Sequence, residues 1–261
     1  MKAVVRNIIS GVLAAALCTG LVLLVRLNHD ERRSIACSGM EVHFTDSLHF
    51  VSKQDILGFI NTRYGVYLGK RLDSLDLSGM ERMLETKGAV LRSEAWTTDD
   101  GLLHISVSQR APAMMFRNGD KGFYIDRDAY IFPLHKSFTA DVFTVHGDIP
   151  VDIPEGYKGE APTEAERAWL KGMLSMNELL EGSRKWKNLA DSVSIHPNGD
   201  IVMRTCRGDE EFILGGTDRL KEKFAEIEKY YDYIVPSKGE GFYKNINIKY
   251  RRQIICRQTG T

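Results

Sequence analysis

The stretch that decides the fold is "AVLRSEAWTTDDGLLHISVSQR", residues 89–110. Apolar and polar residues alternate on both sides of its centre, which is the period of a half-buried strand. The two runs are joined by residues 98–101, which end in Asp100-Gly101. Asp-Gly between two alternating runs is a strong hairpin signal, because glycine accepts the positive φ of a tight turn. The stretch therefore predicts an antiparallel β-hairpin.

Upstream of this hairpin, the pattern predicts one strand and two short helices. Residues 40–49 alternate loosely and are typical of a strand followed by a turn. Ser52 is a plausible helix N-cap, with Asp55 three residues further on, and a second helix would begin at Asp76 or Ser78. The order is β-α-α-β-β. The apolar faces of the helices are Ile56, Leu57 and Ile60 in the first, and Met80, Met83 and Leu84 in the second.

Downstream of the hairpin the chain is rich in short strands. Thr163 and Glu166 form a capping box for one amphipathic helix, and a second helix runs from about Asp218 to Tyr233. Asn198-Gly199 predicts another hairpin. The fold class is α+β. The strand candidates are residues 113–117, 122–126, 130–134, 142–147, the two strands of the hairpin that turns at Asn198-Gly199, and residues 210–216.

The chain ends with another alternating run, "NINIKYRRQIICRQ", residues 245–258. We expect a single edge strand here, with Tyr250 on its apolar side and Arg252 interrupting that side. An edge strand leaves N–H and C=O groups unpaired for an incoming strand, and cationic side chains would select acidic partners. The alternative is an ordinary edge that Lys and Arg protect against aggregation.

The N-terminal segment predicts a membrane anchor. Residues 7–25 carry no charge, and as a helix they would span about 28 Å, close to a bilayer core of about 30 Å. A cleaved signal peptide is the alternative, although charged residues follow the apolar run directly. Basic residues are nearly balanced across the span, so charge alone leaves its orientation open.

Composition and motifs give no sign of nucleic-acid binding or of catalysis. Basic and acidic residues number 35 each, so no basic excess points to nucleic acid. No catalytic fingerprint or C-x-x-C metal spacing occurs, and we expect no catalytic residue, metal, cofactor or small-molecule substrate. We expect Asp126 and Asp128 to form hydrogen bonds within a turn, which is more common for two such carboxylates than binding a cation. Cys206 and Cys256 could meet on neighbouring strands, which leaves a disulfide open, but two small buried residues is the favoured interpretation.

The order of these elements resembles the FtsQ/DivIB family of the bacterial division machinery, with a POTRA domain formed by the β-α-α-β-β unit. Two departures stand out: Ala129 occupies a turn position where the family commonly has glycine, and Asn247 replaces a common aspartate. The matching stretches are "FVSKQDILGFI" (50–60), "YLGKRLDSLDLSGMERMLE" (67–85), "ISVSQRAP" (105–112), "GFYIDRDAYIFPL" (122–134), "FTVHG" (143–147) and "YKNINIKYRRQII" (243–255).

The resemblance implies a non-enzymatic divisome scaffold that supports septal peptidoglycan synthesis and binds FtsB, itself paired with FtsL, besides other divisome proteins. It would cross the inner membrane once, with a cytoplasmic N-terminus and periplasmic domains at the septum. The alternatives are a POTRA-bearing envelope assembly or secretion component and a membrane-tethered envelope hydrolase. The expected partner-binding residues are Lys249, Tyr250, Arg251, Arg252, Gln253 and Ile254. The expected parts are a tail (1–6), a transmembrane helix (7–25), a linker (26–39), a POTRA-like domain (40–111), a β-rich C-terminal domain (112–256) and a second tail (257–261).

Overall fold

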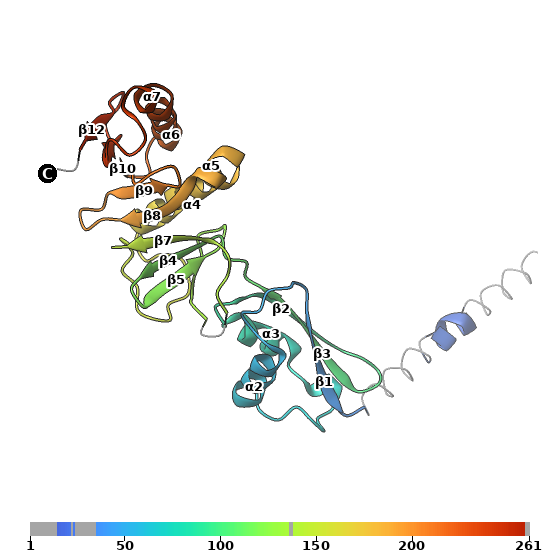
Figure 1. The fold of residues 1–261 in the computed structure, drawn as a ribbon. Helices are drawn as coiled ribbons and strands as arrows, with labels where there is room; N and C mark the ends of the chain where they lie inside the picture. Colours follow the sequence, from blue (N-terminus) through green and yellow to red (C-terminus); the bar gives the residue numbers. More distant parts are fainter. Residues whose placement is uncertain (1–14, 22, 24–34, 136–137, 259–261) are drawn as a thin grey trace, which may run out of the picture. The chain divides into compact units, whose positions relative to one another are not determined.

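The computed structural model describes residues 15–21, 23, 35–135 and 138–258 (Figure 1). The chain divides into two compact units, residues 1–109 and residues 110–261. Within the described part of the chain, no helix is long and apolar enough to cross a membrane. The predicted span at 7–25 and the predicted tails and linker lie wholly or partly outside the described residues.

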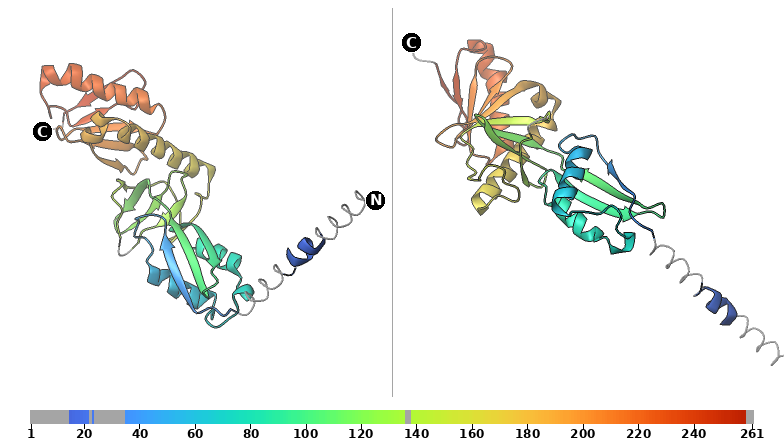
Figure 2. Two further views of the ribbon diagram at one scale, coloured as in Figure 1. Left: turned by 90° about the vertical axis from the view of Figure 1, so that its right-hand side faces the viewer. Right: turned by 90° about the horizontal axis from the view of Figure 1, so that it is seen from below.

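The first unit is a three-stranded sheet, and two α-helices cover one of its faces (Figures 1 and 2). The strand order is β1-β3-β2, with β1 parallel and β2 antiparallel to the central strand β3. The predicted hairpin is confirmed, since β2 and β3 pair around the turn at residues 98–101. The elements are β1 (Gly39–Phe44), α2 (Lys53–Arg63), the 3₁₀ turn η1 (Leu72–Ser74), α3 (Leu77–Glu85), β2 (Val90–Thr97) and β3 (Leu102–Gln109).

The caps and apolar faces of the two helices match the sequence prediction closely. Ser52 and Asp55 form the expected capping box, since each side chain accepts a hydrogen bond from the other's backbone N–H, at 3.1 and 2.9 Å. Of the two candidate caps for α3, Asp76 is the one used. Leu57 and Met83 are only half-buried. The core of the unit includes Val42, Ile56, Ile60, Met80, Leu84, Leu103, Ile105 and Val107.

The second unit is built on a nine-stranded mixed sheet with the order β12-β11-β10-β9-β8-β7-β4-β5-β6. Apolar side chains of α4 and α6 are buried in one core with those of the sheet. The elements are β4 (Met114–Asn118), β5 (Lys121–Ile125), β6 (Ile131–Pro133), β7 (Phe143–Gly147), α4 (Glu164–Glu181), α5 (Arg184–Leu189), β8 (Ala190–Ile195), β9 (Ile201–Thr205), β10 (Glu211–Gly215), α6 (Leu220–Lys229), the π-helical turn η2 (Tyr230–Ile234), α7 (Val235–Lys238), β11 (Asn245–Asn247) and β12 (Ile255–Arg257).

The turn after β5 is closed by the side chain of Asp126. Asp126 Oδ1 accepts hydrogen bonds from the backbone N–H groups of Asp128 and Tyr130, both at 2.9 Å. Its other oxygen accepts from Arg110 Nη1 at 2.5 Å, and the two side chains are 8% and 12% exposed. The interpretation as hydrogen bonding within a turn is therefore confirmed for Asp126. Ala129 adopts a φ of 62°, a left-handed conformation that glycine adopts at lower cost.

The prediction of one continuous strand over 245–258 is wrong. The segment forms a hairpin: β11 pairs in parallel with β10, and β12 folds back antiparallel onto β11. Arg252, which interrupts the apolar alternation, lies in the connecting turn with a φ of 57°. Tyr250 is 52% exposed instead of facing the core. The alternation before and after Arg252 belongs to two strands, because the chain reverses between them.

Cys206 and Cys256 do not meet on adjacent strands, and the favoured interpretation of two small buried residues is wrong for Cys206. Cys206 follows β9 and Cys256 lies in β12, so two strands of the sheet separate them. Both thiols are free. Cys206 is exposed and Cys256 is half-buried.

Candidate protein-binding edge

The backbone of β11 divides its hydrogen-bonding groups between its two neighbours. On the β10 side, Glu211 N–H donates to Lys244 O at 2.7 Å, and Ile248 N–H donates to Ile213 O at 3.0 Å. Successive residues of a strand direct their backbone groups to opposite sides. The N–H and C=O of Ile246 therefore face β10, and those of the two flanking asparagines face β12.

The same reasoning shows which groups of β12 remain for a partner. Asn245 pairs with Arg257, and Asn247 pairs with Ile255. Since the asparagine backbones face β12, these are the pairs that exchange hydrogen bonds. The N–H and C=O of Cys256, midway between them, consequently point away from β11. Among the described residues no strand pairs with this outer side, because β12 is the end of the sheet order.

The side chains of β12 divide between the core and the surface. Cys256 is half-buried against the core of the unit, and this burial raises the pKa of its thiol. Ile255 is 38% exposed and Arg257 is exposed. The outer edge thus carries an apolar and a cationic side chain beside its open backbone groups.

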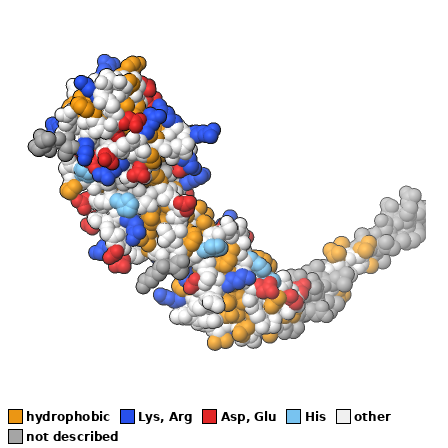
Figure 3. Space-filling view, viewed as in Figure 1, with side chains coloured by type: hydrophobic (Ala, Val, Ile, Leu, Met, Phe, Trp, Pro, Cys, Tyr) orange, Lys and Arg blue, Asp and Glu red, His pale blue; other side chains and the backbone are white. Residues whose placement is uncertain are grey.

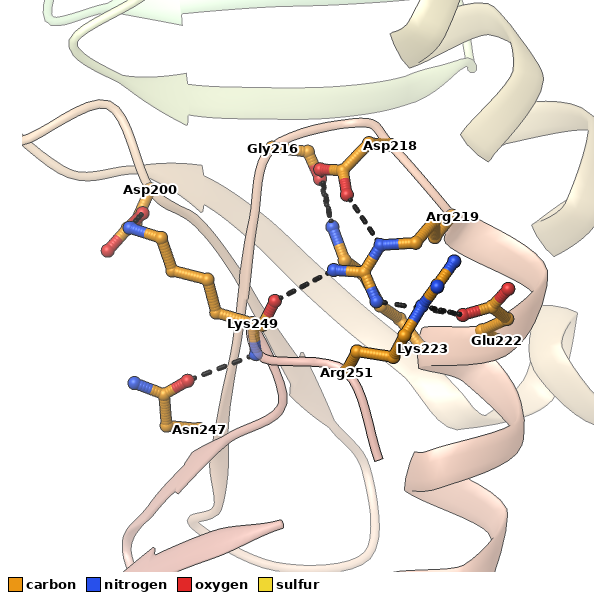
Figure 4. Close-up of polar contacts among 9 residues, drawn as sticks. All are labelled: Asp200, Gly216, Asp218, Arg219, Glu222, Lys223, Asn247, Lys249 and Arg251. Atoms are coloured by element: carbon orange, nitrogen blue, oxygen red, sulfur yellow. Dashed lines mark hydrogen bonds and ion pairs between the residues drawn. The ribbon is translucent and has the colours of Figure 1, made fainter. Parts of the chain in front are cut away.

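The loop between β11 and β12 is held at Lys249 (Figure 4). Asn247 Oδ1 accepts from the Lys249 backbone N–H at 3.0 Å. Lys249 Nζ donates to Asp200 Oδ1, in the β8–β9 turn, at 2.7 Å. The Asp200 carboxylate stabilises the charged amine and so raises the pKa of Lys249. Asn247 thus supplies an acceptor for the loop that follows it.

Arg219, the residue before α6, fixes the other side of the loop (Figure 4). Its Nη2 donates to Lys249 O at 3.0 Å, and its Nε donates to Asp218 Oδ2 at 2.9 Å. Its Nη1 lies 3.6 Å from Glu222 Oε2, which is also 3.8 Å from Arg251 Nε. One guanidinium therefore joins the start of α6 to the loop that precedes β12.

Beneath Arg219, the amine of Lys223 is almost fully buried. It donates to Gly216 O at 2.8 Å and to Asp218 Oδ1 at 2.9 Å, and its side chain is 2% exposed. The Lys223 ammonium holds the pKa of Asp218 below its usual range. This contact fixes Asp218, the carboxylate that orients Arg219.

A hollow of about 390 Å³ lies between α6 and the loop. Five basic and two acidic side chains line it, so its local charge is positive although the chain as a whole is neutral. On the face of this unit shown in Figure 3, acidic and basic side chains are intermixed. The basic lining residues are Arg219, Lys223, Lys229, Arg251 and Arg252, and the acidic ones are Glu222 and Glu226.

The six sequence-predicted binding residues lie together, but in the loop and not along the edge strand. Tyr250, Arg251, Arg252 and Gln253 are exposed, and Ile254 is partly packed against the core. Sequence reasoning missed Ile255, Cys256 and Arg257, which form the edge itself. The available signal was the charged residue at 252 on the apolar side of the alternation, which marks the reversal of the chain.

The fold and this edge define a class of protein: a β-α-α-β-β unit followed by a strand-rich unit that ends at an open sheet edge beside a basic hollow. The model of a POTRA-like domain matches residues 35–108. The model of the family described as FtsQ/DivIB, C-terminal related, matches residues 111–257, more than half of the chain. The chain belongs to this FtsQ/DivIB family and carries a POTRA-like domain, as the sequence motifs predicted. A comparison with curated proteins found no match. Membership indicates a role in bacterial cell division.

Proposed function

We propose that this protein is a membrane-anchored, non-enzymatic divisome scaffold that binds FtsB, itself paired with FtsL, along the outer side of β12. The observation that carries the proposal is the open edge of the second unit: the backbone N–H and C=O of Cys256 face away from β11. An extended segment of FtsB would add a further strand there. Main-chain hydrogen bonds would give affinity, and flanking side chains would give specificity.

Charge around the edge supports an acidic partner segment. Arg251, Arg252 and Arg257 are exposed beside β12, and basic residues dominate the lining of the adjacent hollow. Complementary charge mainly raises the association rate and orients the partner. Arg251→Glu should therefore slow association with FtsB and reduce its dependence on salt.

Replacing Cys256 tests the edge most directly. Proline has no N–H and cannot donate to an added strand, whereas alanine can. Leaving the partner's carbonyl unsatisfied costs about 1–3 kcal/mol, so Cys256→Pro should weaken FtsB binding by roughly 5- to 150-fold. Cys256→Ala is the matched control and should bind nearly as the native chain does. The measurement is FtsB affinity of the full chain in detergent by calorimetry.

A second proline separates loss of binding from loss of folding. By alternation the N–H of Gln258 also faces outward, and its side chain is exposed, so Gln258→Pro perturbs the core less than Cys256→Pro. If both proline variants keep their melting temperature and bind FtsB as tightly as the native chain, the edge is not the binding site.

The proposed topology has residues 1–6 in the cytoplasm, residues 7–25 in the inner membrane and both units in the periplasm at the septum. The exposed thiol of Cys206 offers a native probe once the other three cysteines are replaced. A membrane-impermeant maleimide should label it in intact spheroplasts. Labelling that requires permeabilised membranes would contradict this orientation.

A further inference from the structure

The face of the first unit's sheet that lies opposite its helices carries a compact group of polar and aromatic side chains. The register of the three strands places Glu41, His104 and Trp96 in one row across β1, β3 and β2. His43 lies two residues beyond Glu41 on β1, so it shares this face. The intervening apolar residues of β1 and β3 point to the other face and are buried under the helices.

Three potential ligand atoms of this group lie close together. His43 Nε2 is 3.4 Å from His104 Nδ1, and Glu41 Oε2 is 3.6 Å from the first and 3.7 Å from the second. A triangle with these sides has a centre about 2.1 Å from each corner, which matches the usual length of Zn–N and Zn–O bonds. Within the described residues this is the one such group of three.

The far side of the His104 ring supports the same arrangement. His104 Nε2 lies 3.0 Å from Thr98 Oγ1, and the Thr98 hydroxyl itself donates to Asp100. With its own proton directed to Asp100, the threonine oxygen can accept a hydrogen bond from Nε2–H. That contact leaves the lone pair on Nδ1, the atom that faces Glu41 and His43. A ligating histidine commonly has such a partner on its other nitrogen, which fixes its tautomer and orientation.

Ring stacking holds both imidazoles in place. The Trp96 ring stacks on His104, with centroids 5.3 Å apart, and His43 stacks on His104 at 5.7 Å. The side chain of His104 is 14% exposed, whereas those of His43 and Glu41 are 50% and 54% exposed. Ligand atoms on one side of the ion would come from the protein, and solvent can reach the other side.

We propose that Glu41, His43 and His104 bind one Zn²⁺ ion, with water completing the coordination. Two imidazole nitrogens and one carboxylate suit a borderline transition-metal ion and disfavour Mg²⁺ and Ca²⁺, which take oxygen ligands. The sequence shows no metal-ligand spacing for this group, because its members come from strands about sixty residues apart. The site lies in the POTRA-like unit and is independent of the β12 edge.

Calorimetry with ZnCl₂ alone tests the site on the full chain in detergent. The protein should lack a polyhistidine tag, be stripped of metal, and be kept reduced with a non-chelating phosphine because its four cysteines are free. We expect one equivalent to bind with micromolar or tighter affinity. His43→Ala and Glu41→Gln should each weaken that event on the order of 100-fold, and Thr98→Val about 10-fold. His196→Ala, an exposed histidine of the second unit, is the matched control and should leave it unchanged.

Co²⁺ and Cu²⁺ give readouts that calorimetry does not. Bound Co²⁺ should show visible d–d absorption in the native chain and lose it in His43→Ala. Cu²⁺ should quench Trp96 fluorescence because the indole stacks on a ligating ring, and Trp96→Phe should remove this quenching without removing Zn²⁺ binding. Thermal melts of each metal-free variant show whether it is folded. If folded His43→Ala binds Zn²⁺ as the native chain does, or the native chain binds none, the proposal is wrong.

Discussion

The buried ion pair between Arg110 and Asp126 offers a sharp test of what stabilises the second unit. Asp126 accepts from Arg110 and from two backbone N–H groups of its own turn, and the guanidinium also lies 3.7 Å from the Tyr130 ring centroid. Asp126→Ala removes all three acceptor contacts. Asp126→Asn keeps an oxygen acceptor for the turn but puts an amide NH2 where the other oxygen accepts from Arg110, so both the charge and that hydrogen bond are lost. The two variants therefore separate the ion pair from the turn.

The expected cost follows from the burial of both side chains. Removing one partner of a buried ion pair leaves the other charge uncompensated and costs about 3–5 kcal/mol, which is our expectation for Asp126→Asn. Asp126→Ala also loses two turn hydrogen bonds, each contributing about 0.5–1.5 kcal/mol. At about 2–4 °C per kcal/mol for a unit of this size, the melting temperature should fall by roughly 6–20 °C in Asp126→Asn and further in Asp126→Ala.

Urea unfolding of the full chain in detergent measures these costs. In a Trp96→Phe background the remaining tryptophans, Trp169 and Trp186, both belong to the second unit, so fluorescence reports on that unit alone. Arg110→Met combined with Asp126→Asn completes a double-mutant cycle. The combined loss should be clearly smaller than the sum of the single losses, because neither charge is then left unpaired. Additive losses, or an unchanged Asp126→Asn variant, would refute the reasoning.

Three further predictions concern other parts of the fold. Ile60→Ala should destabilise the first unit by about 2–5 kcal/mol in urea unfolding followed by Trp96 fluorescence, since Ile60 is fully buried; an unchanged midpoint would remove this helix face from the core. Ala129→Gly should stabilise the second unit by about 1 kcal/mol, because it relieves a left-handed alanine, and a lower midpoint would show that packing of the buried methyl matters more. Burial raises the pKa of Tyr231 to about 12, so the folded state binds more protons between pH 10 and 12 and should lose stability as the pH rises through that window. Tyr231→Phe should lose less over the same window, and identical pH profiles would contradict the assignment.

The sequence by itself determined the features that depend on neighbours in the chain. The capping boxes at Ser52 and Thr163 and the hairpin turns at Gly101 and Gly199 were all predicted, and the structure contains each. A cap or a tight turn is closed by hydrogen bonds over two to four residues. It therefore depends only on residues that are consecutive in the sequence. The family followed from the order of such elements.

The tertiary structure decided which strands that are distant in the sequence become neighbours. Alternation over 245–258 fits one long strand or two short ones equally well, because a chain reversal preserves the period. Pairing of β11 with β10 is set by contacts far along the chain, and it turns the backbone of Cys256 outward. The group of Glu41, His43 and His104 has the same origin. Its ligand atoms meet only because β1 lies parallel to β3, a pairing between distant segments that no local pattern encodes.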